Sequence, residues 1–93
     1  MLFRSTGNDL LRLMQSSDFQ EKAVAMGYVA GAIDMGDQII FCSPNGRVTI
    51  GQTRDILQIY LENNPALRHL PADALIIDVF KKLWPCPKRG TAL

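Results

Sequence analysis

The chain has 93 residues, of which 47% are hydrophobic and 20% are charged, and this is the composition of an ordinary globular domain rather than a disordered segment. Ten basic residues against nine acidic ones argue against a nucleic-acid-binding protein, which needs a concentrated cationic surface. No apolar stretch approaches the roughly 20 residues that cross a bilayer. We therefore expect one domain over residues 1–93, with no nucleic acid partner and no insertion into a membrane.

The first seven residues lack the apolar region of a secretory signal peptide. This observation fits a cytoplasmic protein. It fits equally a mature chain whose signal peptide has been removed, so the compartment stays open at this point.

Two capping pairs predict two helices in the first forty residues. Thr6 with Asp9 predicts a short helix that ends near residue 15. Ser17 with Gln20 predicts a long helix that runs to about residue 38. The apolar spacing of this long helix predicts a central element. Its expected buried stripe consists of Phe19, Ala23, Met26, Ala30 and Ile33, widened by Val24, Tyr28, Gly31 and Met35.

Gly27 and Gly31 lie one turn apart in the predicted long helix. Each glycine costs about 1 kcal/mol relative to alanine inside a helix. We therefore expect the small side chains here to let a neighbouring backbone of the same domain approach closely.

The middle of the chain predicts a short extended or hairpin connection. Residues 39–42 form an apolar run, residues 43–46 read Ser-Pro-Asn-Gly, a strong turn signal, and residues 47–49 are expected to pair back. Thr49 with Gln52 then predicts a helix to about residue 63. The residues expected on its buried side are Ile50, Leu57, Tyr60 and Leu61.

Two prolines organise the last third of the chain. Pro65 ends the third helix, and a single turn to about His69 follows. Pro71 is expected at the first position of a last helix, which closes at residues 84–86. Leu75, Val79 and Leu83 are expected to point inward. The fold class is therefore all-α: a compact bundle of about four helices with a short extended or hairpin connection in mid-chain.

Few side chains are available for chemistry. One histidine and two distant cysteines do not make a recognisable zinc site, and no nucleophile and base have catalytic spacing. We therefore predict no catalytic residues, no metal and no cofactor. Asp34 and Asp37 share a helix face, where a solvated helix end is the expected role. Cys42 and Cys86 fit either a disulfide, which would contribute about 4 kcal/mol, or two buried thiols.

The connection between the two prolines contains Arg68 and His69. In one interpretation, Arg68 caps the carbonyls of the preceding helix and His69 packs against the edge of the core. In the other, the two residues form an exposed polar projection that enters a cleft of a partner. The residues alone favour the first interpretation.

A series of short motifs occurs in order along the chain: Thr6-Gly7-Asn8-Asp9-Leu10-Leu11, Gly27-Tyr28-Val29-Ala30-Gly31, Cys42-Ser43-Pro44, Tyr60-Leu61, Pro65, Arg68-His69, Ala72 and Trp84-Pro85-Cys86. In this series the chain resembles the Rap/Tai-type immunity proteins of bacterial type VI secretion systems. The resemblance covers about residues 6–86.

This resemblance implies a small helical periplasmic protein, often a homodimer, that inhibits a papain-like peptidoglycan amidase by inserting a protruding loop into its active-site groove. By position, the residues implicated in partner binding are Asn63, Asn64, Pro65, Ala66, Arg68, His69 and Pro71. The resemblance also implies that Cys42 and Cys86 form a disulfide, because the periplasm is oxidising. Relatives often have two further cysteines, near the positions of Met14 and Ala25 here.

The leading hypothesis is therefore a periplasmic immunity protein, with a signal peptide removed, that occludes an amidase. The alternative is a non-enzymatic cytosolic structural or adaptor protein on the same helical scaffold. A helix-turn-helix regulator is a third hypothesis, but the basic recognition helix is missing. An enzyme comes last.

Overall fold

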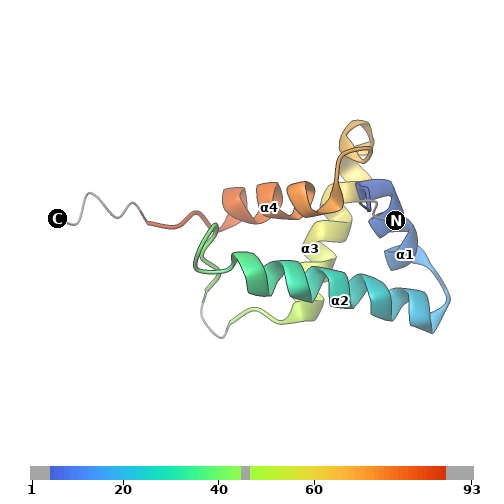
Figure 1. Ribbon diagram of the computed structural model, residues 1–93, viewed down its shortest axis with the longest axis horizontal. Coiled ribbons are helices and arrows are strands. Elements are labelled where there is room, and N and C mark those ends of the chain that lie inside the picture. Colours follow the sequence, from blue (N-terminus) through green and yellow to red (C-terminus); the bar gives the residue numbers. More distant parts are fainter. Residues whose placement is uncertain (1–4, 45–46, 88–93) are drawn as a thin grey trace, which may run out of the picture.

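The computed structural model describes residues 5–44 and 47–87. It contains α1 (Gly7–Gln15), α2 (Phe19–Gly36), α3 (Ile50–Asn63), a 3₁₀ turn η1 (Pro65–Leu67) and α4 (Ala72–Leu83), and no strand lies in the described ranges. Figure 1 shows α2 and α4 side by side, running in the same direction, with α3 crossing behind them. The all-α bundle of four helices predicted from the sequence is confirmed.

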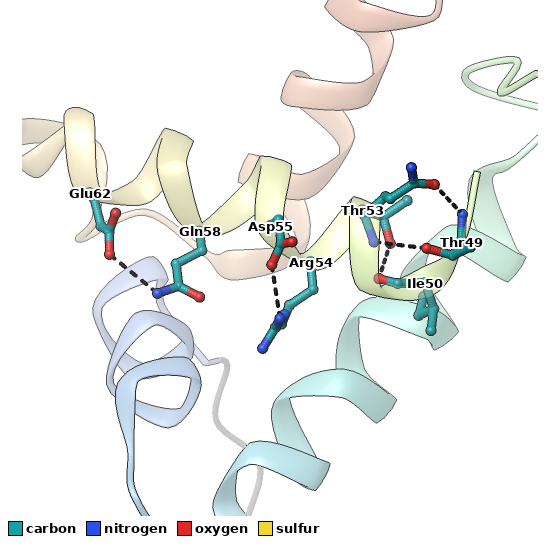
Figure 2. Close-up of polar contacts among 8 residues, drawn as sticks. Thr49, Ile50, Thr53, Arg54, Asp55, Gln58 and Glu62 are labelled. Carbon is teal, nitrogen blue, oxygen red and sulfur yellow. Dashed lines mark hydrogen bonds and ion pairs between the residues drawn. The ribbon is translucent and has the colours of Figure 1, made fainter. Parts of the chain in front are cut away.

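Two of the three predicted capping pairs are confirmed. Thr6 Oγ1 accepts a hydrogen bond from the Asp9 amide at 3.2 Å, and Asp9 Oδ2 accepts one from the Thr6 amide at 3.0 Å. These hydrogen bonds to Thr6 lower the pKa of Asp9, and the nearby charge of Arg12 lowers it further. Thr49 and Gln52 form the same reciprocal pair at the start of α3, where Figure 2 labels Thr49.

The predicted start of α2 is wrong by one residue. The cap is Asp18 rather than Ser17, because Asp18 Oδ1 accepts a hydrogen bond from the Gln20 amide at 2.8 Å. A carboxylate at this position also interacts favourably with the positive end of the helix dipole. The helix ends at Gly36, two residues before the predicted end.

The predicted buried stripe of α2 is also wrong. Phe19 is 83% exposed and Met35 is 78% exposed. The residues that are buried are Ala25, Val29 and Gly36. Of the predicted set, Ala23, Val24 and Gly31 are exposed, whereas Met26, Tyr28, Ala30 and Ile33 are half-buried. The face of α2 that carries the smaller side chains therefore packs against the core, which lets α2 lie close to its neighbours.

The prediction that a neighbouring backbone lies close to Gly27 and Gly31 is wrong. A Cβ atom added to Gly27 or Gly31 would have no other described atom within 4 Å, so no backbone of a neighbouring element in the described ranges lies against them. A Cβ on Gly36 would lie 2.7 Å from the ring of Phe41, because Phe41 packs directly on the end of α2. Gly36 is therefore the position in α2 where absence of a side chain permits close packing.

The predicted extended run at residues 39–42 is instead a tight turn. The amides of Ile39 and Ile40 both donate to the Gly36 carbonyl, at 3.1 and 2.7 Å. Gln38 has a positive φ of 65°, which reverses the chain after α2. No hairpin with residues 47–49 forms in the described part of the chain, and Asn45 and Gly46 lie outside it.

The other helices bury most of the predicted residues. Leu57 and Leu61 of α3 and Leu75 and Val79 of α4 are in the core. Ile50, at 39% exposed, and Leu83, at 47%, are not. Pro71 is the residue before α4 rather than its first residue. The core as a whole consists of Leu10, Leu11, Met14, Ala25, Val29, Phe41, Leu57, Leu61, Ala72, Leu75, Ile76, Val79 and Phe80.

The ends of α2 and α4 are joined by a disulfide between Cys42 and Cys86, whose Cα atoms are 4.9 Å apart. The Cys42 amide also donates to the Trp84 carbonyl at 2.8 Å. Beside this connection, the ring of Phe80 stacks on Trp84 at a centroid distance of 5.1 Å and lies 5.6 Å from Phe41. The disulfide implied by the resemblance is therefore present.

Asp37, at the end of α2, is hydrogen-bonded to Ser43, and this contact makes the stability of the fold depend on pH. Burial alone would raise its pKa, but the Ser43 hydroxyl at 2.7 Å and the Ser43 amide at 2.9 Å donate to its carboxylate and lower the pKa below 3.8. Because the folded pKa is lowered, the stabilisation is present above pH 3.8 and is lost as the pH falls through the folded pKa. We expect Asp37→Asn to flatten the acid limb of a urea-unfolding series relative to the wild type. An unchanged slope in Asp37→Asn would contradict this role.

Candidate functional site

The loop at residues 63–71, which connects α3 to α4, protrudes from the helical body (Figure 1). The last turn of α3 leads into it and is tied to α1. Gln15 Nε2 in α1 and Gln58 Nε2 in α3 each donate to Glu62 Oε2 at 3.2 Å, and Figure 2 shows the pair within α3. These contacts fix the direction in which the chain leaves α3.

The far side of the loop is held by main-chain hydrogen bonds to the start of α1. The amide of Gly7 donates to the Leu70 carbonyl at 3.0 Å, and the amide of Asn8 donates to the Arg68 carbonyl at 2.8 Å. The amide of Ala72 donates to the Ser5 carbonyl at 2.8 Å. The first amides of a helix lack partners within the helix, so the loop satisfies donors that α1 would otherwise expose.

The loop also has internal hydrogen bonds. Asn64 Nδ2 donates to the Tyr60 carbonyl at 2.8 Å and satisfies an acceptor at the end of α3. The Leu67 amide donates to the Asn64 carbonyl, and the Leu70 amide donates to the Leu67 carbonyl, both at 3.0 Å. The loop therefore consists of two consecutive tight turns. The sequence predicted a single turn after Pro65, so the second turn was missed.

The structure places the predicted partner-binding residues in two groups. Asn63, Pro65, Ala66 and His69 are exposed. Asn64, Arg68 and Pro71 are half-buried. The prediction omitted Leu67, which is 37% exposed at the end of η1. An apolar residue within a short connection bounded by two prolines is the signal in the sequence that would have identified it.

Neither interpretation of Arg68 and His69 is fully correct. His69 is exposed and does not pack into the core edge. No hydrogen bond from the Arg68 side chain caps α3 in the described part of the chain, and Arg68 Nε is buried without a hydrogen-bond partner there. The Arg68 side chain instead contributes to an open polar depression together with Asn8, Leu11, Arg12, Gln15, Ser16, Ser17 and Glu21. Of the two residues, His69 is therefore the one exposed on the loop, whereas Arg68 is half-buried.

Gly7 is the position that brings α1 and the loop together. A Cβ atom there would lie 2.6 Å from Leu75 Cδ1 and 3.1 Å from the Cα atom and carbonyl oxygen of Arg68. We expect Gly7→Ala to lower the free energy of unfolding by about 1 to 3 kcal/mol, because the backbone of the loop must move. Chemical denaturation measures this. Gly51→Ala is the control, because its added Cβ meets only Thr49 Oγ1, at 3.8 Å, so no loss is expected. An equal loss in both variants would contradict the close approach.

Features of other functional classes are absent from the described ranges. No cluster of three metal-ligating side chains occurs there, and none of the described helices is long and apolar enough to cross a membrane. Asp37 is engaged by Ser43, and Asp34 is exposed at the surface of α2. The expected role of a solvated helix end therefore fits Asp34, whereas Asp37 is half-buried and hydrogen-bonded to Ser43.

These features define a small, disulfide-linked helical domain that presents one fixed, protruding loop. The family model of the Rap1a immunity proteins matches residues 6–86. A comparison with curated proteins found none that matches the chain. Because the family model covers most of the sequence, the chain belongs to the Rap1a immunity protein family. Membership of this family indicates an inhibitor rather than an enzyme, and implies that the protein binds a cognate secreted effector.

Proposed function

We propose that this chain is a periplasmic immunity protein that binds a type VI secretion effector, a papain-like peptidoglycan amidase, and occludes its active-site groove with the loop at residues 63–71. The observation that carries the proposal is the loop itself, which stands outside the helical body while main-chain hydrogen bonds hold its base. A loop that is already ordered loses little conformational entropy when it binds. Inhibition by obstruction needs such a loop and no reactive group.

The exposed residues of the loop form the proposed contact surface. Pro65, Ala66, Leu67 and His69 are exposed on consecutive turns. Their side chains are compact and mostly uncharged, which suits a narrow groove. His69 adds a polar group that can donate or accept a hydrogen bond there.

Inhibition of the amidase tests the proposal directly. The chain, with its disulfide intact, is titrated into the papain-like amidase proposed as its effector, and hydrolysis of peptidoglycan peptides is followed. We expect hydrolysis to fall towards zero at a saturating ratio. Unchanged hydrolysis would refute the proposed activity.

Two loop variants test the contact surface. Ala66→Arg places a long cation at the exposed end of the loop and should weaken inhibition at least about thirtyfold, which corresponds to roughly 2 kcal/mol. His69→Ala should have a smaller effect in the same direction. Ile59→Arg is the matched control, because Ile59 is exposed on α3 outside the loop. Inhibition by Ala66→Arg that equals the wild type would move the contact surface away from the loop.

The proposed location is supported by the disulfide, because such bonds persist in oxidising compartments and are reduced in the cytoplasm. Alkylation of the protein in its native host, without reductant, separates the two compartments. We expect no reaction at Cys42 or Cys86. Two alkylated thiols would favour the cytosolic adaptor hypothesis.

A further inference from the structure

The open polar depression beside the loop at residues 63–71 is separate from the exposed contact surface proposed above. Its wall is formed by α1, the connection from α1 to α2, the first turn of α2, and Arg68 of the loop. Figure 1 shows α1 next to the base of the loop, where main-chain hydrogen bonds join the two. Because Arg68 belongs to both the loop and the depression, a partner that covers the loop also comes close to the depression.

The Arg68 side chain carries a positive charge that the described part of the chain does not pair. It has no hydrogen bond and no ion pair there, and its Nε atom is buried. Arg54 also has a buried Nε atom without a partner, but its Nη2 atom donates to Asp55 at 2.8 Å. A buried donor without an acceptor is costly, and an acceptor supplied from outside the chain would remove that cost.

The other side chains of the depression offer donors, whereas its carboxylate is already engaged. Asn8 and Ser17 are exposed, and their side chains make no hydrogen bond in the described ranges. The Ser16 hydroxyl donates to Glu21 Oε1 at 2.6 Å, and Arg12 Nη1 lies 3.7 Å from Glu21 Oε2. Two arginines thus face one glutamate in the lining. Uncommitted donors around an unpaired cation fit an anionic acceptor.

We propose that this depression binds a carboxylate side chain, of an aspartate or a glutamate, on the effector whose groove the loop occludes. The inference rests on the proposed function and adds a second contact of stated chemistry to it. The Arg68 guanidinium pairs with the carboxylate, and Asn8 and Ser17 supply further donors from the same wall. Such a contact fixes the orientation of the loop in the groove and makes the affinity depend on salt.

Arg68→Met tests the cation, because it removes the charge and the donors but keeps a long apolar side chain. Calorimetric titration into the amidase should show binding about tenfold to hundredfold weaker than that of the wild type. The melting temperature of the free chain should stay the same or rise, because an unpaired buried donor is removed. Lys81→Gln is the matched control, since Lys81 is an exposed cation in the last turn of α4, outside the depression. Its affinity should equal that of the wild type.

Glu21→Gln tests the same contact with the opposite sign. This variant removes the carboxylate of the lining and leaves Arg12 free to attract an incoming anion. Affinity for the amidase should therefore rise about threefold to tenfold. High salt should weaken binding of the wild type more than binding of Arg68→Met. Equal or weaker binding by Glu21→Gln would contradict an anionic partner group.

Arg68→Lys identifies the partner group, because it places a primary amine in the depression. A carbodiimide joins this amine to a carboxylate in contact with it as an amide, and the reagent takes up the water that is released. Peptide mapping of the cross-linked complex by mass spectrometry should find position 68 joined to an aspartate or glutamate of the amidase. No cross-link at position 68, or an amide to Glu21 within the chain, would overturn the inference.

The affinity and melting measurements separate the inference from the proposed function. A wild type that inhibits the amidase, with Arg68→Met binding as tightly, overturns the inference and leaves occlusion by the loop intact. A fall in both the affinity and the melting temperature of Arg68→Met would assign Arg68 to support of the fold and would also overturn the inference. A wild type that does not bind the amidase refutes the proposed function and the inference with it.

Discussion

Replacement of Cys42 and Cys86 together by serine is expected to lower the free energy of unfolding by about 4 kcal/mol. The disulfide joins residues that are separated by 44 positions, and the loop it closes removes conformational freedom from the unfolded chain. A domain of this size has only about 5 to 14 kcal/mol of stability in total. The melting temperature should therefore fall by about 15 to 25 °C.

The wild-type protein supplies the control for this prediction. A reductant should lower the melting temperature of the wild type to about that of the double serine variant. It should leave the variant itself unchanged. A wild type that melts at the same temperature with and without reductant would contradict the stabilising role of the bond.

Phe80→Ala is expected to have a comparable effect, with a loss of about 3 to 5 kcal/mol. Phe80 is fully buried, and its ring lies between those of Phe41 and Trp84. Removal of the ring leaves a cavity that Phe41 cannot fill, because the Phe41 ring is packed against Gly36. Urea denaturation at neutral pH gives the free energy directly.

Leu83→Ala is the matched control on the same helix. Leu83 is 47% exposed, so its removal uncovers little cavity and should cost less than about 1 kcal/mol. Similar losses at Phe80 and Leu83 would mean that the aromatic stack is not the centre of this end of the core.

The parts of the fold that could be predicted are those that depend on neighbouring residues. Thr6 with Asp9, and Thr49 with Gln52, identified the starts of α1 and α3, because a capping pair is completed within one turn of helix. Pro65 identified the end of α3 for the same local reason. These signals need no knowledge of which helix packs on which.

The orientation of α2 could not be predicted in this way. Apolar residues occur on nearly all its sides, so the periodicity that reveals a buried face is weak. The large apolar side chains Phe19 and Met35 suggested a buried face, but both are exposed. The structure buries Ala25 and Val29, because α2 packs against α1, α3 and α4, and close packing on several neighbours favours small side chains.

The candidate site was predicted in position but not in detail. Two prolines indicated a fixed connection after α3, and the loop at residues 63–71 is that connection. The prediction could not show that Gly7 and Asn8 hold the loop, because they are distant in sequence from Leu70 and Arg68. It also could not show that the Arg68 side chain turns towards α1 rather than outward.

The disulfide has a consequence for proteolysis. The covalent ring that it closes, from residue 42 to residue 86, contains α3, the protruding loop and α4. A protease that cuts the exposed loop therefore yields two fragments that stay joined through sulfur. Such a nicked molecule would keep its mass on a non-reducing gel, apart from the added water, and would separate into two pieces only after reduction.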